Sequence, residues 1–453
     1  MCNLLFCLHY FGRKRFLTIM QLKKNSWGNI SSPNHQFKDL DSKDVAQNTI
    51  SNHSNGIVYG MGRSYGDVCL NQDGLLWKSK KLNRLISFDE KLGILECESG
   101  MTLKSIQDLV IPKGWMLPVS PGTQFVTVGG AIANDIHGKN HHQAGTFGNH
   151  ITEILLLRSD SDPILCGPNK NKNWFKATIG GIGLTGIIFS CKIQLKKING
   201  SWLEAESIPF QGLDKFFELT KESDSDWEYT AAWIDCLYKK EIRGIFERGK
   251  HVIKDKKFKN FQISFPFTPP FSLVNKLTIS IFNPIYFFLK SFFSGKRTIH
   301  YSKFLHPLDN IHNWNRMYGT RGFYQFQCVM PHESSKETLK KMLDLITELK
   351  MGSFLAVLKS FSNFEPVGLL SFSEPGITFA MDFPNKGNKT ELLFHELEKI
   401  VIQSGGKIYL AKDMLMSKES FEASYKSLDS FATFRDPNIS SQMSKRLFGD
   451  SIG

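Results

Sequence analysis

The 453-residue sequence has none of the cysteine spacings that build a metal centre or a disulfide framework. Its eight cysteines lie far apart, with no CxxC pair and no cysteine–histidine combination at zinc-binding spacing. Cys191 and Cys328 lie inside apolar, strand-like runs, so we expect them to be buried thiols. The pattern excludes a disulfide scaffold, fits a reducing compartment and predicts no metal site.

Two nucleotide-binding fingerprints are also missing. No GxxxxGK[ST] run occurs, which argues against a P-loop ATPase, and the glycines of YGMGRSYGD (59–67) do not have GxGxxG spacing. Long apolar runs are missing too. The charge-free run Leu277–Leu289 has 13 residues and contains Pro284, whereas a membrane-spanning helix needs roughly 20 residues. The segment is either an ordinary helical insertion or one that lies on an anionic bilayer surface. The Lys-rich stretch KHVIKDKKFKNF, which precedes it, fits the second interpretation.

A secretory signal is not recognisable at the start of the chain. The apolar stretch Met1–Tyr10 precedes the basic residues Arg13–Arg15, which is the reverse of the order in a signal peptide. We expect residues 1–20 to be a disordered N-terminal extension, with translation starting at Met1 or at Met20. A short membrane anchor is the alternative.

Acidic residues are comparatively scarce. The chain has 56 Lys and Arg residues against 43 Asp and Glu residues, a net charge of +13. This excess fits an anionic substrate or cofactor, a membrane surface or nucleic acid, and it also fits general compositional drift. Nucleic acid is disfavoured, because the lysines are scattered and no recognised binding module is present.

The length and the change in composition near residue 198 predict two domains of α+β class. In the first half we expect a strand in 93–100, a helix that Thr102 caps, a hairpin in 151–167 and a buried strand in 184–195. In the second half, strands at 323–331, 354–359, 377–384 and 407–411 alternate with two amphipathic helices in the order β-α-β-β-α-β. Such a ferredoxin-like element covers one face of its sheet with helices and leaves the other for a cavity wall. No internal sequence repeat is seen.

The richest segment of the chain is Ser120–Ile151, which has six glycines and four histidines. Glycine allows close approach of the backbone to a ligand, and turns of this kind form anion-binding nests. Two further glycine-rich segments, 59–67 and 179–187, lie within 130 residues of one another. Several such turns suit a long ligand with an internal pyrophosphate.

The motifs GMGRSYGD, PGTQFVTVGGAIANDIHGKNHHQAGTFGNH and GGIGLTGI together resemble the FAD-binding domain of the vanillyl-alcohol-oxidase (PCMH-type) flavoenzymes. Within that superfamily they most resemble the 2′-oxidases of polyprenylphosphoryl-ribose. LHPLDNIHNWNRMYG, FYQFQ and GGKIYLAKD extend the resemblance, which covers most of 55–200 and 300–450. It implies a two-subdomain FAD-binding domain over 21–197, a substrate or cap domain with an antiparallel sheet over 198–406, and a C-terminal segment, 407–453, that returns to the FAD domain.

The resemblance also implies which residues hold FAD, with the pyrophosphate on the Gly60–Gly66 loop. The implied FAD-binding residues are Gly60, Met61, Gly62, Arg63, Ser64, Tyr65, Gly66, Pro121, Gly122, Thr123, Thr127, Gly129, Gly130, Ala133, Asn134, His137, Gly138, Asn140, Gly145, Gly183, Ile187 and Tyr409. Some relatives attach FAD through a His in a GxGHS-type loop. Arg63 stands at that place here, so we expect a non-covalent flavin.

Flavin chemistry then requires a group that handles the proton of a secondary alcohol whose hydride goes to flavin N5. The candidates are Lys412, Tyr409 and His137, while Lys359, Gln325, Gln327 and Lys412 are expected to bind substrate. The expected reaction is oxidation of a sugar hydroxyl, C2′ of a polyprenylphosphoryl-ribose, as the first half of an epimerisation that a short-chain reductase completes. An aldonolactone (D-arabinono-1,4-lactone type) or alditol oxidase is the alternative enzyme, and a flavin-binding module without turnover is the alternative outside catalysis. The expected location is cytoplasmic, peripheral on the inner face of the membrane.

Overall fold

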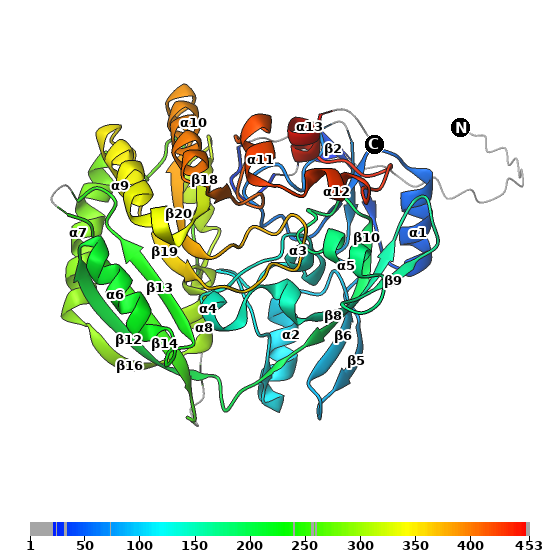
Figure 1. Cartoon of the computed structure of the whole chain (residues 1–453), viewed down its shortest axis with the longest axis horizontal. Helices are drawn as coiled ribbons and strands as arrows, with labels where there is room; N and C mark the ends of the chain where they lie inside the picture. The colour runs from blue at the N-terminus through cyan, green and yellow to red at the C-terminus, as the bar shows by residue number, and fades with distance from the viewer. Residues whose placement is uncertain are drawn as a thin grey trace, which may run out of the picture.

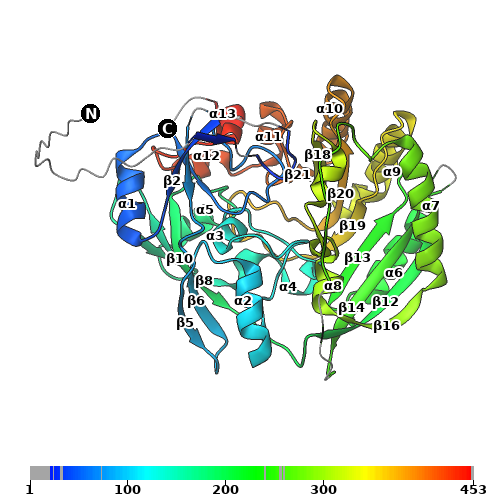
Figure 2. The same cartoon turned by 180° about the vertical axis from the view of Figure 1, so that it is seen from behind.

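The computed structural model describes residues 21–23, 25–30, 34–72, 74–238, 241–254, 258 and 261–449. The expected extension, residues 1–20, lies outside them. Figures 1 and 2 show two lobes, of which one is coloured blue to cyan and includes the red C-terminal helices, and the other is coloured green to orange. We call them the first domain (the described residues of 21–197 and 409–449) and the second domain (the described residues of 202–408).

The first domain contains two sheets. The four-stranded sheet, in the order β1-β2-β4-β3, consists of β1 (Gln21–Lys23), β2 (Asn34–Asp39), β3 (Gly56–Tyr59) and β4 (Leu75–Lys78). The five-stranded sheet, in the order β5-β6-β10-β8-β9, consists of β5 (Leu85–Asp89), β6 (Ile94–Glu98), β8 (Ile151–Leu157), β9 (Ile164–Cys166) and β10 (Ile187–Gln194). The strands expected in 93–100 and 184–195 and the hairpin β8–β9 are thereby confirmed.

Helices and short pairings connect these sheets. They are α1 (Lys43–Asn52), α2 (Leu103–Val110), α3 (Val128–Ala133), α4 (His141–Ala144), α5 (Lys172–Thr178) and the pair of β7 (Trp115–Met116) with β11 (Lys196–Lys197). The hydroxyl of Thr102 accepts a hydrogen bond from the backbone N–H of Ser105, so the expected cap of α2 is present.

The second domain is built on one eight-stranded antiparallel sheet in the order β16-β12-β14-β13-β19-β20-β18-β21. Its strands are β12 (Trp202–Gln211), β13 (Tyr229–Ile234), β14 (Arg243–Val252), β16 (Gly295–His300), β18 (Phe323–Met330), β19 (Ala356–Phe361), β20 (Gly376–Pro384) and β21 (Lys407–Ile408). Its helices are α6 (Leu213–Ser223), α7 (Lys276–Phe292), α9 (His332–Glu348) and α10 (Asn388–Gln403). The elements expected beyond residue 320 are all present.

The sheet contains a repeat of structure that the sequence did not reveal. Its C-terminal half, β18-α9-β19-β20-α10-β21, and its N-terminal half, β12-α6-β13-β14-α7-β16, have the same order of elements and of strands, and they join where β13 pairs with β19. The halves differ in one helix. Phe216 of α6 shares a core with Ala232 and Ile234 of β13, whereas Tyr286 of α7 contacts Trp233, which points the other way. Helices α6 and α7 therefore cover opposite faces, α6 in front in Figure 1 and α7 in front in Figure 2.

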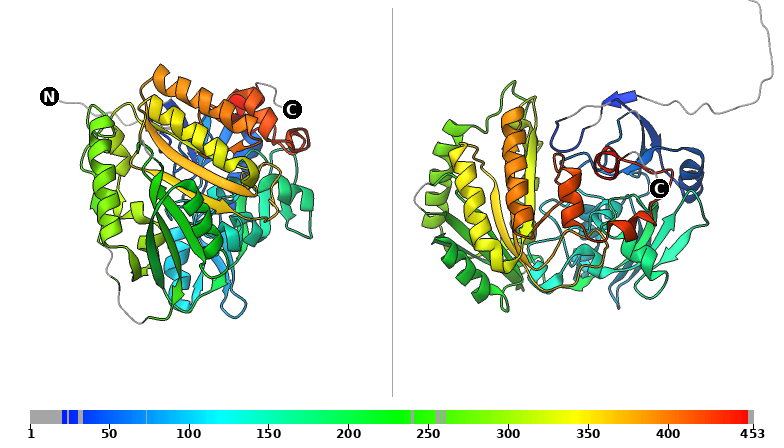
Figure 3. Two further views of the ribbon diagram at one scale, coloured as in Figure 1. Left: turned by 60° about the vertical axis from the view of Figure 1, so that its left-hand side comes forward. Right: turned by 45° about the horizontal axis from the view of Figure 1, so that its top comes forward.

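Helices α9 and α10 lie side by side on one face of the sheet (Figure 3). Leu339 and Leu397 are fully buried there. The opposite face of β18 and β19 carries Gln327 and Lys359 toward the first domain. Between β16 and β18 lie α8 (Tyr301–Leu305) and β17 (Ile311–His312), and β17 pairs with β15 (Ile263–Ser264).

After β21 the chain returns to the first domain through α11 (Lys418–Ser424), α12 (Leu428–Ala432) and α13 (Gln442–Phe448). The backbone N–H of Gly56 donates to the carbonyl of Asn438 at 3.1 Å, and that of Ser440 donates to Gly56 at 3.0 Å. The returning segment is thus hydrogen-bonded to the start of β3. It completes the first domain, and it brings residues 409–413 beside the Gly60–Gly66 loop.

Candidate active site

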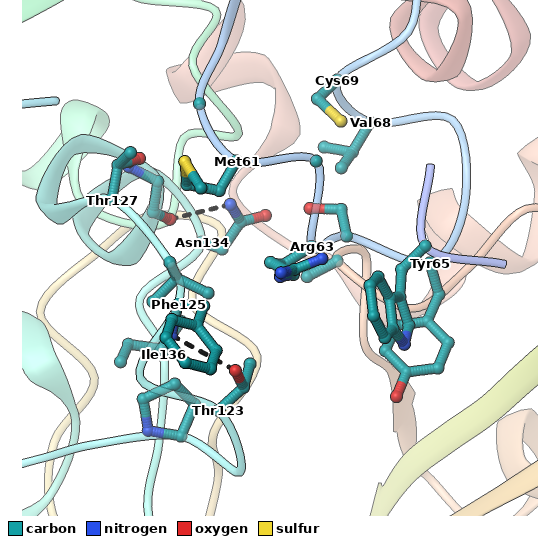
Figure 4. Close-up of a pocket in the computed structure, with 18 of the residues that line it drawn as sticks. Met61, Arg63, Tyr65, Val68, Cys69, Thr123, Phe125, Thr127, Asn134 and Ile136 are labelled. Carbon is teal, nitrogen blue, oxygen red and sulfur yellow. Dashed lines mark hydrogen bonds between the residues drawn. The ribbon is translucent and has the colours of Figure 1, made fainter. Parts of the chain in front are cut away.

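A cavity of about 310 Å³ lies where the two domains meet. Its walls come from the loop after β3, from the segment around α3, from the turn before β10, from β18 and β19, and from the turn after β21. In Figure 4 the side chains of Met61, Arg63 and Val68 come from one segment, and those of Phe125, Thr127 and Asn134 come from another. Segments far apart in sequence therefore form one site.

The loop Gly60–Gly66 is held tightly by its neighbours. Gly62 has φ +61°, a left-handed conformation that favours glycine. A Cβ atom on Gly66 would lie 1.7 Å from the backbone oxygen of Asp413, so the turn after β21 can approach only a glycine here. The backbone N–H of Tyr65 donates to the carbonyl of Ala411 at 3.1 Å, which fixes the loop to the returning segment.

The second wall is the start of α3. The Thr127 hydroxyl caps the helix by accepting a hydrogen bond from the N–H of Gly130 at 3.2 Å. Asn134 ends the helix and donates from Nδ2 to the carbonyl of Gly130 at 2.9 Å. Its Oδ1 atom is buried and accepts no hydrogen bond from any residue that the structure describes. This oxygen is free to receive a donor from the cavity.

Most residues expected at the flavin line this cavity. They are Gly60, Met61, Gly62, Arg63, Ser64, Tyr65, Pro121, Gly122, Thr123, Thr127, Gly129, Gly130, Ala133, Asn134, His137, Gly183 and Tyr409. Of the residues expected at the substrate, Lys359, Gln327 and Lys412 line it as well.

Six expected residues do not line the cavity; they are Gly66, Gly138, Asn140, Gly145, Ile187 and Gln325. Asn140 donates to the carbonyl of Pro118 and supports the loop from behind. Ile187 is fully buried in the core, while its neighbours Gly186 and Ile188 reach the cavity. Gln325 donates to the carboxylate of Asp382. These side chains support the site from outside its walls.

His137 joins the two domains at the cavity. Nε2 of Gln327 donates to Nε2 of His137 at 3.0 Å, so the imidazole accepts there and carries its proton on Nδ1. Burial, aided by the charges of Lys359 and Lys412, lowers the pKa of His137 well below 6.5. Its Nδ1 atom is buried and has no hydrogen-bond partner among the described residues. The ring is thus a neutral donor facing the site.

His141 and His142, which follow His137 in the chain, have different surroundings. Nε2 of His142 lies 2.8 Å from the carbonyl oxygen of Trp227, which is a structural hydrogen bond. The ring of His141 instead stacks on Phe361 with centroids 4.1 Å apart, and neither of its nitrogens has a partner among the described residues. Among those residues, no group of three or more His, Cys, Asp or Glu side chains is placed to hold a metal ion.

Tyr409 is held in place by its own hydroxyl, which donates to the carbonyl of Asn134 at 2.9 Å. Burial, with a smaller effect from Asp135, raises the pKa of this phenol above 10. Its ring stacks on Phe372 with centroids 4.6 Å apart. A phenol in this state does not accept a proton near neutral pH, so Tyr409 positions the Asn134 backbone and forms a wall.

Lys412 has the surroundings of a reactive amine. Its Nζ lies 3.7 Å from the ring centroid of Tyr65. Burial lowers the pKa of Lys412, and the carboxylate of Asp382 opposes the change. Burial also disfavours the charged form of Asp382 and so raises the pKa of its carboxyl group. The Oδ2 atom of Asp382 lies 3.5 Å from the hydroxyl of Tyr318. Lys412 and Asp382 therefore form a buried pair whose charges depend on one another.

A second buried amine lies on β19. Burial, together with repulsion from Lys139 and Lys412, lowers the pKa of Lys359 to about 7. Two buried amines that repel each other are costly unless an anion reaches them. The cavity is therefore suited to a ligand that brings negative charge.

Sequence reasoning missed two parts of the site. The segment 308–314 supplies Leu308, Asp309, Ile311, His312, Asn313 and Trp314 to the cavity wall. The Asp309 carboxylate accepts from the backbone N–H of Gln124 at 2.9 Å and so joins the segment to the second wall. Asp382 was missed too. Its alternation with Ala380 and Thr378 on β20 could have placed it on the cavity face of the sheet.

These walls fit FAD. Buried polar atoms need partners, and the cavity offers the Asn134 oxygen as an acceptor and the His137 Nδ1–H as a donor. At Gly122 a Cβ atom would meet nothing within 4 Å, so bare backbone faces open space. The three glycine segments would hold the dinucleotide, and Gln327, Lys359 and Lys412 line the same cavity.

Comparison with known proteins agrees with this fit. Residues 48–167 match the family described as "FAD binding domain". Over 415 residues the chain is 35% identical to decaprenylphosphoryl-beta-D-ribose oxidase of Mycolicibacterium smegmatis, which covers 86% of this chain and 88% of that protein. It is 27% identical over 383 residues to an uncharacterised protein of Streptomyces coelicolor, covering 77% of this chain and 100% of that one.

A shorter similarity joins the chain to a putative D-arabinono-1,4-lactone oxidase of Neurospora crassa, at 26% identity over 28% of this chain and 23% of that protein. The mixed α and β fold, the cavity lined by glycine loops and the extent of the first similarity lead to one conclusion. The chain is an FAD-dependent oxidoreductase that belongs to the PCMH-type FAD-binding family.

Proposed function

We propose that the protein oxidises a secondary hydroxyl of a sugar, C2′ of a polyprenylphosphoryl-ribose, as the first half of an epimerisation. The observation that carries the proposal is the pair of buried amines, Lys359 and Lys412, in the same cavity as the neutral His137. The similarity to the mycobacterial decaprenylphosphoryl-beta-D-ribose oxidase supports the choice of substrate.

FAD, when bound, supplies the hydride acceptor for such an oxidation. We assign the alcohol proton to Lys412, because burial leaves part of its amine neutral and able to accept a proton. Asp382 stabilises the ammonium form that results. Gln327 fixes the His137 ring through its hydrogen bond. The unpartnered Nδ1–H of His137 would then be available to the polar edge of the bound cofactor.

Lys359 is proposed to bind the phosphate of the substrate. Its amine is buried on the cavity face of β19, and a phosphodiester anion there would raise its lowered pKa and hold it charged. Lys139 is close enough to repel Lys359, so the anion would relieve that repulsion as well. An uncharged sugar gives no such stabilisation.

We propose that the flavin is held without a covalent bond. Arg63 stands where covalent relatives carry the attached His, and its guanidinium lies 4.3 Å from the ring centroid of Trp27. A guanidinium does not form that bond. Acid precipitation should therefore release all of the yellow colour into the supernatant.

The second candidate is an aldonolactone or alditol oxidase. The match to a putative lactone oxidase favours it, although that match covers only 28% of this chain. Its neutral substrates would leave Lys359 buried without an anion. The two candidates therefore differ in whether the substrate carries phosphate.

We further propose that a short-chain reductase reduces the keto sugar, since oxidation alone does not complete an epimerisation. A cytoplasmic location is proposed on the state of the cysteines. Cys69, Cys97, Cys166, Cys191, Cys236 and Cys328, the cysteines that the structure describes, are all free thiols.

The test is anaerobic bleaching of the flavin. Farnesylphosphoryl-ribose should bleach the absorbance of the pure protein, while D-arabinono-1,4-lactone and alditols should leave it unchanged. The Lys412→Met variant should keep its flavin and bleach about 10² to 10⁴ times more slowly. Lys407→Met, which removes a nearby amine that is not in the cavity wall, should bleach at the normal rate.

Bleaching by lactone or alditol alone would favour the second candidate. A yellow protein that none of the three substrates bleaches would contradict both enzymes and leave a flavin-binding module.

A further inference from the structure

The outward side of α7 is apolar and exposed. Its side chains Leu277, Ile281, Ile285, Phe288, Leu289 and Phe292 are between 48 and 73% exposed. Their spacing of three or four residues places them on one side of the helix, which we call the apolar face of α7. The other side is packed against the protein, because Ile279 and Asn283 are buried.

The chain just before α7 is similarly exposed. Phe261, Ile263, Phe267 and Phe271 are between 51 and 74% exposed. Soluble monomers rarely expose contiguous apolar patches of more than a few hundred Å², so a surface with this many large apolar side chains is expected to have a partner. No helix among the described residues is long and apolar enough to cross a membrane. The partner must therefore be met at the surface.

The charged residues in this part of the sequence are of one sign. From Lys256 to Leu308 the sequence has eight Lys or Arg residues and no Asp or Glu. Lys290 and Arg297 pair inward with Glu247. Lys276 is exposed at the start of α7, and Lys296 is exposed beyond its end, where it lies 3.7 Å from Glu204. An apolar face flanked by exposed lysines is typical of a helix that lies on an anionic bilayer.

The same charges argue against a second copy of the chain. In a two-fold symmetric dimer the same patch lies on both subunits, so the lysines of one copy would face those of the other. A bilayer with anionic head groups has the opposite charge. The occupant that fits both the apolar and the charged residues is therefore a lipid surface.

The apolar face also adjoins the cavity. Helix α7 lies on the face of the large sheet that carries Gln327 and Lys359, and its Tyr286 contacts Trp233 with ring centroids 4.7 Å apart. Ile263, in the segment before α7, pairs with Ile311 of β17, which lines the cavity. Ile279 of α7 shares a core with Trp314, another lining residue.

We propose that the apolar face of α7, with residues 261–271, docks on the surface of an anionic phospholipid bilayer. Figures 1 and 2 show α7 at the outer edge of the second domain, at the end of the molecule opposite α1. Docking holds the β15–β17 wall of the cavity against the membrane. A lipid-linked head group then reaches the amines without its chain crossing water. This last step rests on the proposed function; the docking itself does not.

The experiment is sedimentation of the flavin-loaded full chain with vesicles. The protein should bind vesicles of phosphatidylglycerol and phosphatidylcholine, and binding should weaken with salt and be much weaker on pure phosphatidylcholine. Phe288→Glu combined with Phe292→Glu should lower binding at least about tenfold, because two charges would enter the apolar layer. The matched control Leu92→Glu, at a 62% exposed leucine of the first domain, should bind as the parent does.

The flavin absorbance and bleaching by a short-chain substrate should be the same in all these proteins, which shows that they are folded. No binding of the parent to anionic vesicles, or equal binding by the double variant, would overturn the proposal. So would a dimer in solution that the double variant converts to a monomer. If vesicles are bound but no phosphosugar bleaches the flavin, the docking stands and the proposed function fails.

Discussion

Lys412 gives the site a pH dependence that can be measured. Only the neutral amine accepts a proton, and burial lowers the pKa of Lys412 to about 8. The rate of flavin reduction should therefore rise as pH rises through about 8 and level off above it. The measurement is anaerobic stopped-flow bleaching from about pH 6 to about pH 10.

Asp382→Asn sharpens this prediction. The carboxylate of Asp382 raises the pKa of Lys412, so its removal should shift the midpoint of the profile to lower pH. Asparagine keeps an oxygen that can accept the hydrogen bond from Gln325, so the cavity should keep its shape. A profile with an unchanged midpoint would show that another group accepts the proton. Ser362→Ala, outside the cavity wall, is the control.

Individual residues of the site were predicted to different extents. Lys412 could be found because GGKIYLAKD is a recognisable motif beside a strand. The alternation of β20 could have placed Asp382 on the cavity face of the sheet, but nothing in the sequence around it indicates that β20 lies within reach of the turn after β21. Tyr409 was expected both at the flavin and as a candidate for the proton. Only the structure shows that its hydroxyl donates to the carbonyl of Asn134, which favours a positioning role over that of a base.

Helix α13 holds two loops of the site together through one side chain. Arg446 donates to Asp67 at 3.0 Å and to Asp413 at 2.9 Å, and both carboxylates are almost fully buried. Asp67 follows the Gly60–Gly66 loop, and Asp413 follows Lys412. This ion pair joins the first glycine loop to the turn after β21.

Arg446→Met should therefore destabilise the protein by about 3 kcal/mol, since it leaves two buried carboxylates without their cation. Flavin should also be lost more readily on gel filtration. The measurement is urea unfolding in the presence of excess FAD. In the control, Lys418→Met removes an exposed pair with Glu422 at 3.7 Å and should cost less than about 0.5 kcal/mol. An equal loss of unfolding free energy in the two variants would contradict this role of Arg446.

At the level of elements, the sequence predicted regular amphipathic patterns and missed irregular ones. Strands β18 and β20 and helices α9 and α10 have clear apolar periods and were predicted correctly. The N-terminal half of the sheet was not recognised as a second unit of the same kind. Its strand β16 has the sequence Gly-Lys-Arg-Thr-Ile-His, which lacks an apolar alternation. Its helix α7 carries its large apolar side chains on the solvent-exposed side, whereas a core helix carries them on the buried side. Both features follow from position, since β16 is an edge strand and α7 forms a surface.

Across the whole molecule, the net charge of +13 acts over distances longer than any single contact. Such a field attracts an anionic substrate and speeds its encounter with the site, and dissolved salt screens it. The Debye length falls from about 30 Å at 0.01 M ionic strength to about 8 Å at 0.15 M. Steering of the substrate by the whole charge distribution is therefore strong at 0.01 M ionic strength and weak at 0.15 M.

With a short-chain phosphosugar, kcat/KM should fall by about tenfold between these two ionic strengths. A neutral sugar of similar size should show no comparable fall. Lys359→Gln should lower kcat/KM at every salt concentration and keep most of the slope, because it removes one charge among 56 basic residues and leaves the field in place. A slope that disappears with Lys359 would mean that the salt acts at the phosphate contact alone. The excess of lysines would then have no part in substrate capture.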